Sequence, residues 1–278
     1  MDASYGAYSV RVAMVTGPSS GIGMVIAKTL AADGFHVVAA GRSEARVSPV
    51  VDEIVSDGGS AEFLHLDLAS LASARRAGET FIASGRPLDL LVNNAGIGIS
   101  HRGRTEDGFE VHFGINHLGH FLLTKLLIDA MGTNARVVQV ASSVHYSAKG
   151  IPFDRLRRGT SLIGYREYAV SKLANVLFVR ELARRRPDLA TYAVHPGLVD
   201  TPLIPAWTKP LLRGRLLTPS QGADTPLWSA TSDAVVGETG FYYANRTRLD
   251  PSHPAQDNRL ALELWERSLE WCGLETGH

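Results

Sequence analysis

The most constraining feature of this chain is a strand-like segment that runs into a glycine-rich turn and then into an apolar helical pattern. The segment from Val10 to Gly17 is followed by Gly17-Pro-Ser-Ser-Gly21-Ile-Gly23. Glycines permit positive φ and close backbone approach, while free N–H groups and the helix dipole attract a pyrophosphate. The spacing G-x-x-x-G-x-G differs from the common dinucleotide fingerprint G-x-G-x-x-G. An ordinary strand-to-helix turn would not explain three glycines and two hydroxyls in seven residues. The segment therefore predicts a phosphate-binding turn.

Short runs rich in β-branched residues alternate with helical periodicity along the whole chain. This alternation predicts right-handed crossovers and a parallel sheet with helices on both faces. The expected strands are 11–15, 35–40, 61–66, 88–92, 135–141 and 191–195, with a seventh near 241–243. The predicted fold class is α/β: one doubly wound domain over residues 1–278 with about seven strands.

Composition excludes several classes of protein. The chain has 278 residues, 45% of them hydrophobic, and 28 basic side chains balance 28 acidic ones. A net charge of zero gives no electrostatic reason to expect nucleic acid or an anionic membrane as partner. The single cysteine, Cys272, forms no intramolecular disulfide, which suits a reducing cytoplasm. No signal-like start and no run of about 18 apolar residues is present, so we expect no membrane anchor and a cytoplasmic location.

A phenol and an ammonium lie four residues apart in Tyr168-Ala-Val-Ser-Lys172, within a helical pattern. Positions i and i+4 share one face of a helix, so the charge of Lys172 would favour the phenolate of Tyr168 and lower its pKa. Tyr168 could then act as a general acid or base near neutral pH. On its own, this spacing is more often a solvated helix face.

With the glycine turn and this pair together, the chain resembles the short-chain dehydrogenase/reductase family. Asn93-Asn-Ala-Gly96 and His195-Pro-Gly197-Leu-Val-Asp-Thr201 are similar to two further elements of that family. Four more stretches are similar to its retinol-dehydrogenase-like branch: 105–110, 116–124, 171–175 and 181–185. The resemblance runs from about Val10 to Ser268, and it implies a Rossmann-type NAD(P)-binding fold.

The resemblance also implies catalytic roles. Tyr168 would exchange a proton with the substrate oxygen, and Lys172 would hold the ribose hydroxyls and lower the phenol pKa. Alignment of 136–145 with the branch places Ser142 on the catalytic serine, with Ser143 as the alternative. Asn116 matches the family's catalytic asparagine, which orders a water and the lysine in a proton relay.

The resemblance also implies which residues would contact the coenzyme, and most of them follow a predicted strand. They are Gly17, Ser19, Ser20, Gly21, Ile22, Gly23, Arg42, Ser43, Asp67, Leu68, Asn94, Ala95, Gly96, Tyr168, Lys172, Pro196, Gly197, Val199 and Thr201.

The end of the second strand, Val37-Val-Ala-Ala-Gly-Arg42-Ser43, favours NADP over NAD. An acidic residue there would accept the ribose hydroxyls of NAD, but none is present. Arg42 could bind the 2′-phosphate of NADP, with Ser19 and Ser43 as further donors. An exposed arginine without a ligand is the alternative. Asp67 and Leu68 would flank the adenine.

Two segments without strong periodicity are unusually long, 146–165 and 202–219. Long loops after the strands of such sheets often cover substrates. The apolar character of 202–219 predicts a substrate lid, included in 202–230; packing as a satellite of the core is the alternative.

Three histidines, His112, His117 and His120, lie near one another in a helical pattern. Without an acidic or cysteine partner they predict structural roles, and we expect no metal. The arginines at 155, 157 and 158 are expected to lie in a solvated loop.

The predicted function is an NADP-dependent carbonyl reductase or alcohol dehydrogenase that acts on bulky apolar ketones, aldehydes or alcohols. Two alternatives remain: an NADP-binding pseudo-enzyme with a sensing or scaffolding role, and a tailoring enzyme that catalyses cyclisation or epimerisation. The expected partner is a small molecule rather than nucleic acid, and a homo-oligomer is possible.

Overall fold

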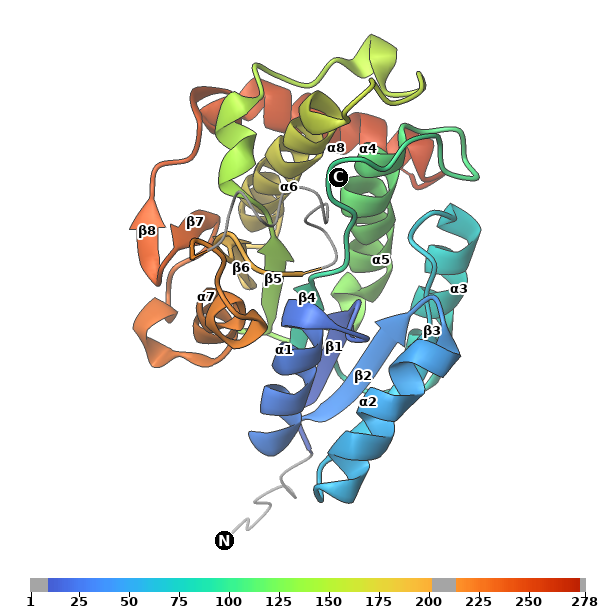
Figure 1. Ribbon diagram of the computed structural model, residues 1–278, viewed down its shortest axis with the longest axis vertical. Helices are drawn as coiled ribbons and strands as arrows, with labels where there is room; N and C mark the ends of the chain where they lie inside the picture. The colour runs from blue at the N-terminus through green and yellow to red at the C-terminus, as the bar shows by residue number, and fades with distance from the viewer. Residues whose placement is uncertain (1–9, 202–213, 276–278) are drawn as a thin grey trace, which may run out of the picture.

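Parallel strands form the centre of the molecule (Figure 1). The computed structural model describes residues 10–201 and 214–275, and within these ranges one sheet has the order β3-β2-β1-β4-β5-β6-β7-β8. The strands are β1 (Val12–Thr16), β2 (His36–Gly41), β3 (Ser60–His65), β4 (Leu90–Asn93), β5 (Arg136–Val140), β6 (Ala190–His195), β7 (Phe241–Ala244) and β8 (Thr247–Leu249). The first seven are parallel, and β8 pairs antiparallel with β7.

The eighth strand is a difference from the seven that the sequence predicts. It forms because Asn245 and Arg246 both have positive φ, 49° and 55°, and turn the chain back after β7. Two left-handed residues in succession give the tight hairpin turn that matches the twist of the strands. All three residues of β8 are exposed, so no alternation of apolar and polar residues marks it.

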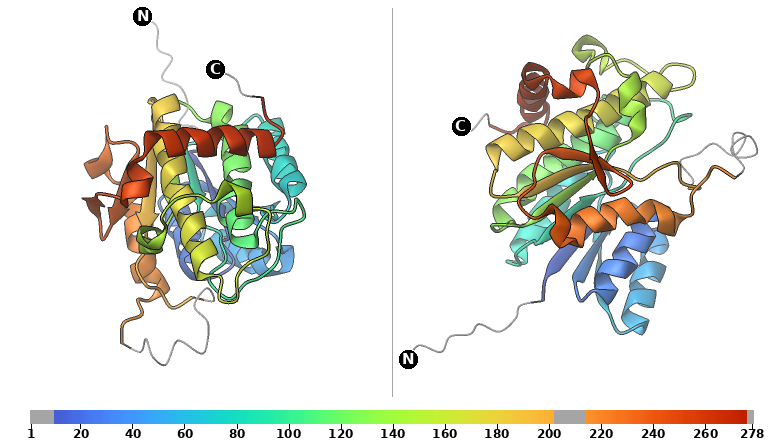
Figure 2. Two further views of the ribbon diagram at one scale, coloured as in Figure 1. Left: turned by 90° about the horizontal axis from the view of Figure 1, so that it is seen from above. Right: turned by 90° about the vertical axis from the view of Figure 1, so that its left-hand side faces the viewer.

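Helices cover both faces of the sheet. They are α1 (Gly21–Ala32), α2 (Glu44–Ser56), α3 (Leu71–Ala83), α4 (Val111–Phe113), α5 (Gly119–Leu127), α6 (Tyr165–Arg185), α7 (Pro219–Thr231) and α8 (Asn258–Trp271). The shorter turns are η1 (Gly114–Leu118), η2 (Ile128–Ala130), η3 (Ser143–Ser147), η4 (Phe153–Arg155), η6 (Asp233–Val235) and η7 (His253–Gln256). Helices α1, α2 and α7 pack on one face; α3, α5 and α6 pack on the other, with α8 outside them (Figure 2).

The buried side chains explain this arrangement. Every residue of β1, from Val12 to Thr16, is buried, as expected for a strand with helices above and below. The apolar stripes of the helices complete two cores, one on each side of the sheet. The doubly wound α/β prediction is therefore confirmed.

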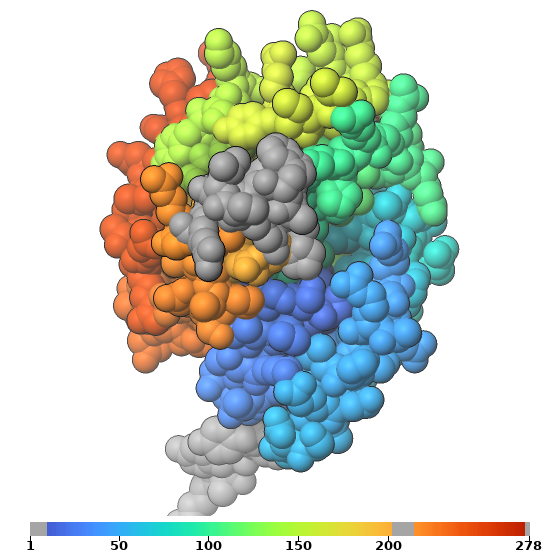
Figure 3. Space-filling model, viewed as in Figure 1, coloured from blue at the N-terminus to red at the C-terminus, as the bar shows by residue number. Residues whose placement is uncertain are grey.

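The strand order changes direction between β1 and β4, since β2 and β3 lie on one side of β1 and the later strands on the other. In such sheets ligands bind at the carboxyl ends of the strands beside this point. Figure 3 shows the face that contains α1 and α2 in blue and the segments after β4 and β5 in green.

No helix within residues 10–201 or 214–275 has both the length and the apolar character needed to cross a bilayer.

Candidate active site

The glycine turn joins β1 to α1 in a conformation that side chains would obstruct. Gly17 and Gly21 have φ of 68° and 59°. A Cβ atom on Gly23 would lie 2.3 Å from the carbonyl oxygen of Gly17 and 2.4 Å from Nδ2 of Asn94. The first two glycines supply the turn, and the third lets α1 approach the backbone before it.

The first turn of α1 has free backbone donors. Its N-cap residue, Ser20, makes no side-chain capping hydrogen bond, and no acidic residue lies in this turn. By contrast, Thr218 caps α7 with a complete capping box, and Asp257 caps α8. The exposed N–H groups and the dipole of α1 suit a phosphate group.

The segment after β4 is tied to this turn. Asn94 Nδ2 donates to the carbonyl oxygen of Thr16 at 2.9 Å. The hydroxyl of Thr16 accepts from the backbone N–H groups of Asn94 at 3.0 Å and Ala95 at 2.9 Å. The side chain of Asn94 thus holds two strand ends together. Thr16 is not among the site residues predicted from the sequence, although it directly precedes the first glycine.

His120 completes this connection. Burial lowers its pKa to about 3, so the ring is neutral at pH 7. Its Nδ1 lies 3.2 Å from the carbonyl oxygen of Asn116 and its Nε2 lies 2.9 Å from Oγ1 of Thr16. A carbonyl only accepts, so Nδ1 carries the hydrogen and Nε2 accepts from the Thr16 hydroxyl.

Asn116 lies in η1, a π-helical turn between α4 and α5. Such turns are rare and occur often at functional sites. Its buried side chain donates to the carbonyl oxygen of Ile97 at 3.1 Å and to Oγ of Ser171 at 3.0 Å, and its Oδ1 accepts from Ile97 N at 2.8 Å. A Cβ on Gly96 would lie 2.9 Å from this Oδ1 and 3.9 Å from Nζ of Lys172, so Gly96 separates the two side chains.

Ser142, Tyr168 and Lys172 come together where β5 ends. Lys172 is 3% exposed and its Nζ donates to the carbonyl oxygen of Val140 at 3.0 Å. The same Nζ lies 5.7 Å from the centre of the Tyr168 ring, and Ser142 forms a hydrogen bond with Tyr168. Ser142 lies two residues after the end of β5 and caps η3.

The pKa values in this group differ from those predicted from spacing. Burial lowers the pKa of Lys172 to about 8. Burial raises the pKa of Tyr168 above its ordinary value, and the hydrogen bond with Ser142 offsets only part of that effect. The expected lowering of the Tyr168 pKa by Lys172 is therefore not found. Helical spacing places two groups side by side but does not report how far water is excluded from them.

The residues proposed for the adenosine half of the coenzyme lie at the ends of β2 and β3. Arg42 is exposed, and among the described residues no hydrogen bond or ion pair engages its side chain. Ser43 is the N-cap of α2 and makes no side-chain cap. Asp67 accepts from Ala69 N at 2.9 Å. Leu68 is 7% exposed and packs in the core, which leaves little of its side chain for a ligand.

The segment after β6 returns towards the glycine turn. Gly197 has φ of 85°, and Val199 pairs with Leu217. A Cβ on Gly21 would lie 3.1 Å from Cγ2 of Thr201. The segment from Pro196 to Thr201 therefore runs from the end of β6 to the start of α1.

The predicted substrate lid, 202–230, falls partly outside the described residues. Residues 202–213 lie outside the described residues. Residues 219–230 belong to α7, which packs against α1 and the core on that face.

A comparison with known protein families matches the part of the chain that carries the candidate active site. Residues 11–211 match the family model described as short chain dehydrogenase. The chain belongs to this family. Because its relatives include dehydrogenases and reductases of the same family, the protein is an oxidoreductase that depends on a nicotinamide coenzyme.

Three human relatives place this short-chain dehydrogenase in the retinol-dehydrogenase-like branch. Dehydrogenase/reductase SDR family member 13 is 41% identical, over 96% of this chain and 74% of the relative. Polyprenol dehydrogenase is 38% identical, over 95% of this chain and 86% of the relative. Retinol dehydrogenase 12 is 38% identical, over 95% of this chain and 87% of the relative.

Two solved structures share the fold of this short-chain dehydrogenase. An uncharacterised protein from Mycobacterium paratuberculosis superposes with a TM-score of 0.81 and 32% identity, over 98% of this chain and 97% of that one. A blue fluorescent protein from a metagenomic library, in complex with NADPH, has a TM-score of 0.69 and 28% identity, over 84% and 96%.

The described residues contain no cluster of three or more His, Cys, Asp or Glu side chains that could hold a metal ion. Arg157, expected in a solvated loop, stacks on Phe109 with its guanidinium 4.1 Å from the ring centre.

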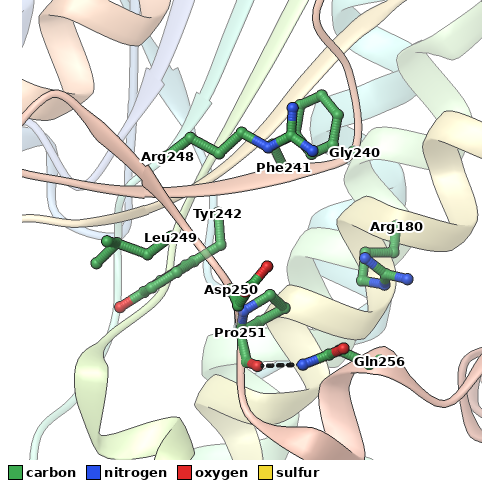
Figure 4. Close-up of a pocket in the computed structure, with 9 residues that line it drawn as sticks. All are labelled: Arg180, Gly240, Phe241, Tyr242, Arg248, Leu249, Asp250, Pro251 and Gln256. Atoms are coloured by element: carbon green, nitrogen blue, oxygen red, sulfur yellow. Dashed lines mark hydrogen bonds between the residues drawn. The ribbon is translucent and has the colours of Figure 1, made fainter.

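A separate hollow of about 80 Å³ lies between α6, β7 and the segment that leads to η7 (Figure 4). Arg180, Asp250 and Gln256 are among its lining residues, and Gln256 donates to the carbonyl oxygen of Pro251 at 2.8 Å. Arg180 follows Tyr168 by 12 residues on α6, which is about 18 Å along the helix axis. This hollow is therefore apart from the candidate active site.

Proposed function

We propose that the protein is an NADP(H)-dependent carbonyl reductase or alcohol dehydrogenase with Tyr168 as general acid and base. The observation that carries the proposal is the group formed by Tyr168, Ser142 and Lys172, which lies beside the point where the strand order changes direction. Residues 1–278 would form a single NAD(P)-binding domain.

The residues present fit a dinucleotide. The free donors at the start of α1 would hold its pyrophosphate, and Gly23 would allow the close approach that this requires. Bound NADPH would supply the hydride that reduces the carbonyl carbon.

The protein's own side chains would manage the proton and the substrate oxygen. Because burial raises the pKa of Tyr168, its phenol keeps its hydrogen at neutral pH and can donate it to the oxygen. The hydroxyl of Ser142 would hold the same oxygen. With a pKa of about 8, Lys172 is mostly charged at pH 7 and would stabilise the phenolate that remains.

The coenzyme preference would come from Arg42. It is exposed at the end of β2, and within the described part of the chain its guanidinium has no competing partner. A guanidinium suits the 2′-phosphate, whereas NAD would need an acid that this segment lacks. A related structure is described in complex with NADPH, which supports this choice.

The substrate class would be long apolar alcohols and the matching aldehydes or ketones. Exposed apolar side chains lie on three segments near the site: Tyr146 after β5, Leu162, Ile163 and Tyr165 before Tyr168, and Leu198 after β6. Such side chains suit an apolar substrate more than a small charged one. Two relatives are named for apolar alcohols, polyprenol and retinol.

An activity screen tests this proposal. The purified protein would be incubated with NADPH and matched sets of aldehydes and ketones, one apolar with long chains and one small and charged, with coenzyme absorbance and product identity both recorded. We expect turnover of the apolar set with one alcohol formed per NADPH consumed. Product formation without NADPH consumption would contradict net reduction and support the tailoring alternative.

A further inference from the structure

A buried acid and a buried histidine lie beside Tyr168 and take no part in the proposed proton transfer. Glu110 is the N-cap of α4, and His112 lies within α4. Their side chains are 4% and 0% exposed, and Nδ1 of His112 lies 2.8 Å from Oε1 of Glu110. The ring of His112 meets the ring of Tyr168 edge-on, with centroids 6.2 Å apart and an interplanar angle of 70°.

The hydrogen bonds of this pair assign its protons. Nε2 of His112 lies 2.9 Å from the carbonyl oxygen of Gly98, so it carries a hydrogen. Burial raises the pKa of Glu110, but hydrogen bonds from His112, Thr160 and the backbone of Phe113 outweigh burial and leave the pKa below its ordinary value. The carboxylate is therefore ionised and Nδ1 carries a hydrogen as well. Both ring nitrogens of His112 thus face acceptors, the hydrogen-bond pattern that an imidazolium makes.

The pair connects the segments that frame Tyr168. His112 bonds to Gly98 in the segment after β4, and Glu110 accepts from the hydroxyl of Thr160 at 2.6 Å. The N-cap of α6 is Gly164, with φ of 75°; a Cβ there would lie 2.8 Å from Cε1 of His112. Since Tyr168 N donates to the carbonyl oxygen of Gly164, the imidazole ring packs against the turn that carries the phenol.

Three polar groups face Tyr168 among the described residues. The hydroxyl of Ser142 comes from the end of β5, Nζ of Lys172 from α6 itself, and the His112 ring from α4. A positive charge on Lys172 or His112 would favour the phenolate, in the direction opposite to burial.

We propose that Glu110 and His112 form a positioning pair for Tyr168: the carboxylate keeps the imidazole doubly protonated, and the resulting cation holds the phenol ring and stabilises its phenolate. This inference rests on the proposed role of Tyr168 as proton donor and acceptor. His112 is a positioning residue because it acts through Tyr168.

Glu110→Gln removes the charge and can keep the contacts with Phe113 and His112, while the hydroxyl of Thr160 would accept from the amide nitrogen instead of donating. The amide oxygen can accept from Phe113 N, while the amide nitrogen donates to Nδ1 of His112, which then becomes neutral and still donates from Nε2 to Gly98. Glu181→Gln is the matched control. Glu181 is equally buried and ion-paired, with Arg185 at 2.7 Å, but it lies more than three turns further along α6.

The readout is the titration of Tyr168 itself in the full chain saturated with NADP⁺, by NMR of protein labelled with ¹³C at the tyrosine ζ-carbons. Tyr168→Phe identifies the signal. In Glu110→Gln we expect the midpoint to rise by at least about 0.5 pH unit, since the positive charge of a ring centred 6.2 Å from the Tyr168 ring would be lost. In Glu181→Gln it should stay at the wild-type value. A midpoint in Glu110→Gln that equals that of wild type would overturn the proposal.

If Glu110→Gln does not fold, the double variant Glu110→Gln/His112→Gln leaves no unpaired charge in the core and supplies the same measurement with the same expected rise. The two proposals fail in different ways. Full turnover in Tyr168→Phe would remove the proposed function, whereas an inactive Tyr168→Phe with an unshifted midpoint in Glu110→Gln would remove only the role of the pair.

Discussion

Burial shifts the pKa values of Tyr168 and Lys172 away from those of free side chains. The lysine pKa falls to about 8 because its ammonium is almost fully removed from water, and the tyrosine pKa rises for the same reason. At pH 7 the pair is therefore a protonated phenol beside a charged lysine. In that state the phenol could donate its proton, as the proposed function requires.

Replacing Arg42 should change the coenzyme preference. The wild-type protein should bind NADPH more tightly than NADH. Arg42→Asp should lower the ratio of the NADH to the NADPH dissociation constant by at least about tenfold, because one charge-assisted contact is lost and a like charge is added. Binding constants from coenzyme fluorescence measure this. Arg46→Asp is the control, because Arg46 is an exposed arginine within α2; it should leave the ratio of the two dissociation constants unchanged. Equal affinities for the two coenzymes in wild type would contradict the assignment.

A methyl group at Gly23 should disrupt the glycine turn. In Gly23→Ala the new Cβ would approach the Gly17 oxygen to 2.3 Å, so the turn must shift. We expect NADPH affinity to fall by at least about tenfold, because the helix donors lose their alignment. Gly132→Ala is the control, since its Cβ would have nothing within 4 Å. The same titration checks both, and unchanged NADPH affinity in Gly23→Ala would disprove the role of the turn.

Single elements differ in how far the sequence predicts them. The β1–turn–α1 unit is predictable because its signal is local: a strand, three glycines and an apolar helix within one stretch. The π-turn at Asn116 and the His120–Thr16 hydrogen bond are not, because both arise when α5 packs against the ends of β1 and β4. The Glu110–His112 pair was missed for a related reason, since its other partners come from Gly98 and Thr160.

Helix α8 should contribute stability without touching the site. Its Leu264 is 1% exposed against α6 and α5, whereas Leu262 is 38% exposed on the same helix. Leu264→Ala should lower the free energy of unfolding by about 2–5 kcal/mol, from lost apolar contact and a cavity. Leu262→Ala should change it by about 0.5 kcal/mol or less. Chemical denaturation measures both, and equal effects would show that α8 does not pack as described.

Across the whole molecule, buried neutral histidines should make folding sensitive to acid. Burial lowers the pKa of both His117 and His120 to about 3, against about 6.5 in an unfolded chain. Between these values the unfolded state binds more protons, so stability is complete above pH 6.5 and falls as the pH is lowered. At pH 5 each of these two histidines should lower the free energy of unfolding by about 2 kcal/mol.

Denaturation midpoints between pH 7.5 and pH 5 measure this loss. His117→Gln should reduce the slope, because one of the buried histidines no longer takes up a proton on unfolding, while His65→Gln, at an exposed position, should leave the slope unchanged. A slope in His117→Gln as steep as that of wild type would show that this histidine does not stay neutral in the folded protein.

The central claim is that Tyr168 moves the proton, and Tyr168→Phe tests it most directly. The variant keeps the ring that His112 contacts and removes only the hydroxyl. NADPH binding and turnover of an apolar aldehyde from the screen would be measured on the same preparation. The account predicts an NADPH dissociation constant within about twofold of wild type and a kcat lower by at least about 100-fold. A kcat within a few-fold of wild type would contradict it.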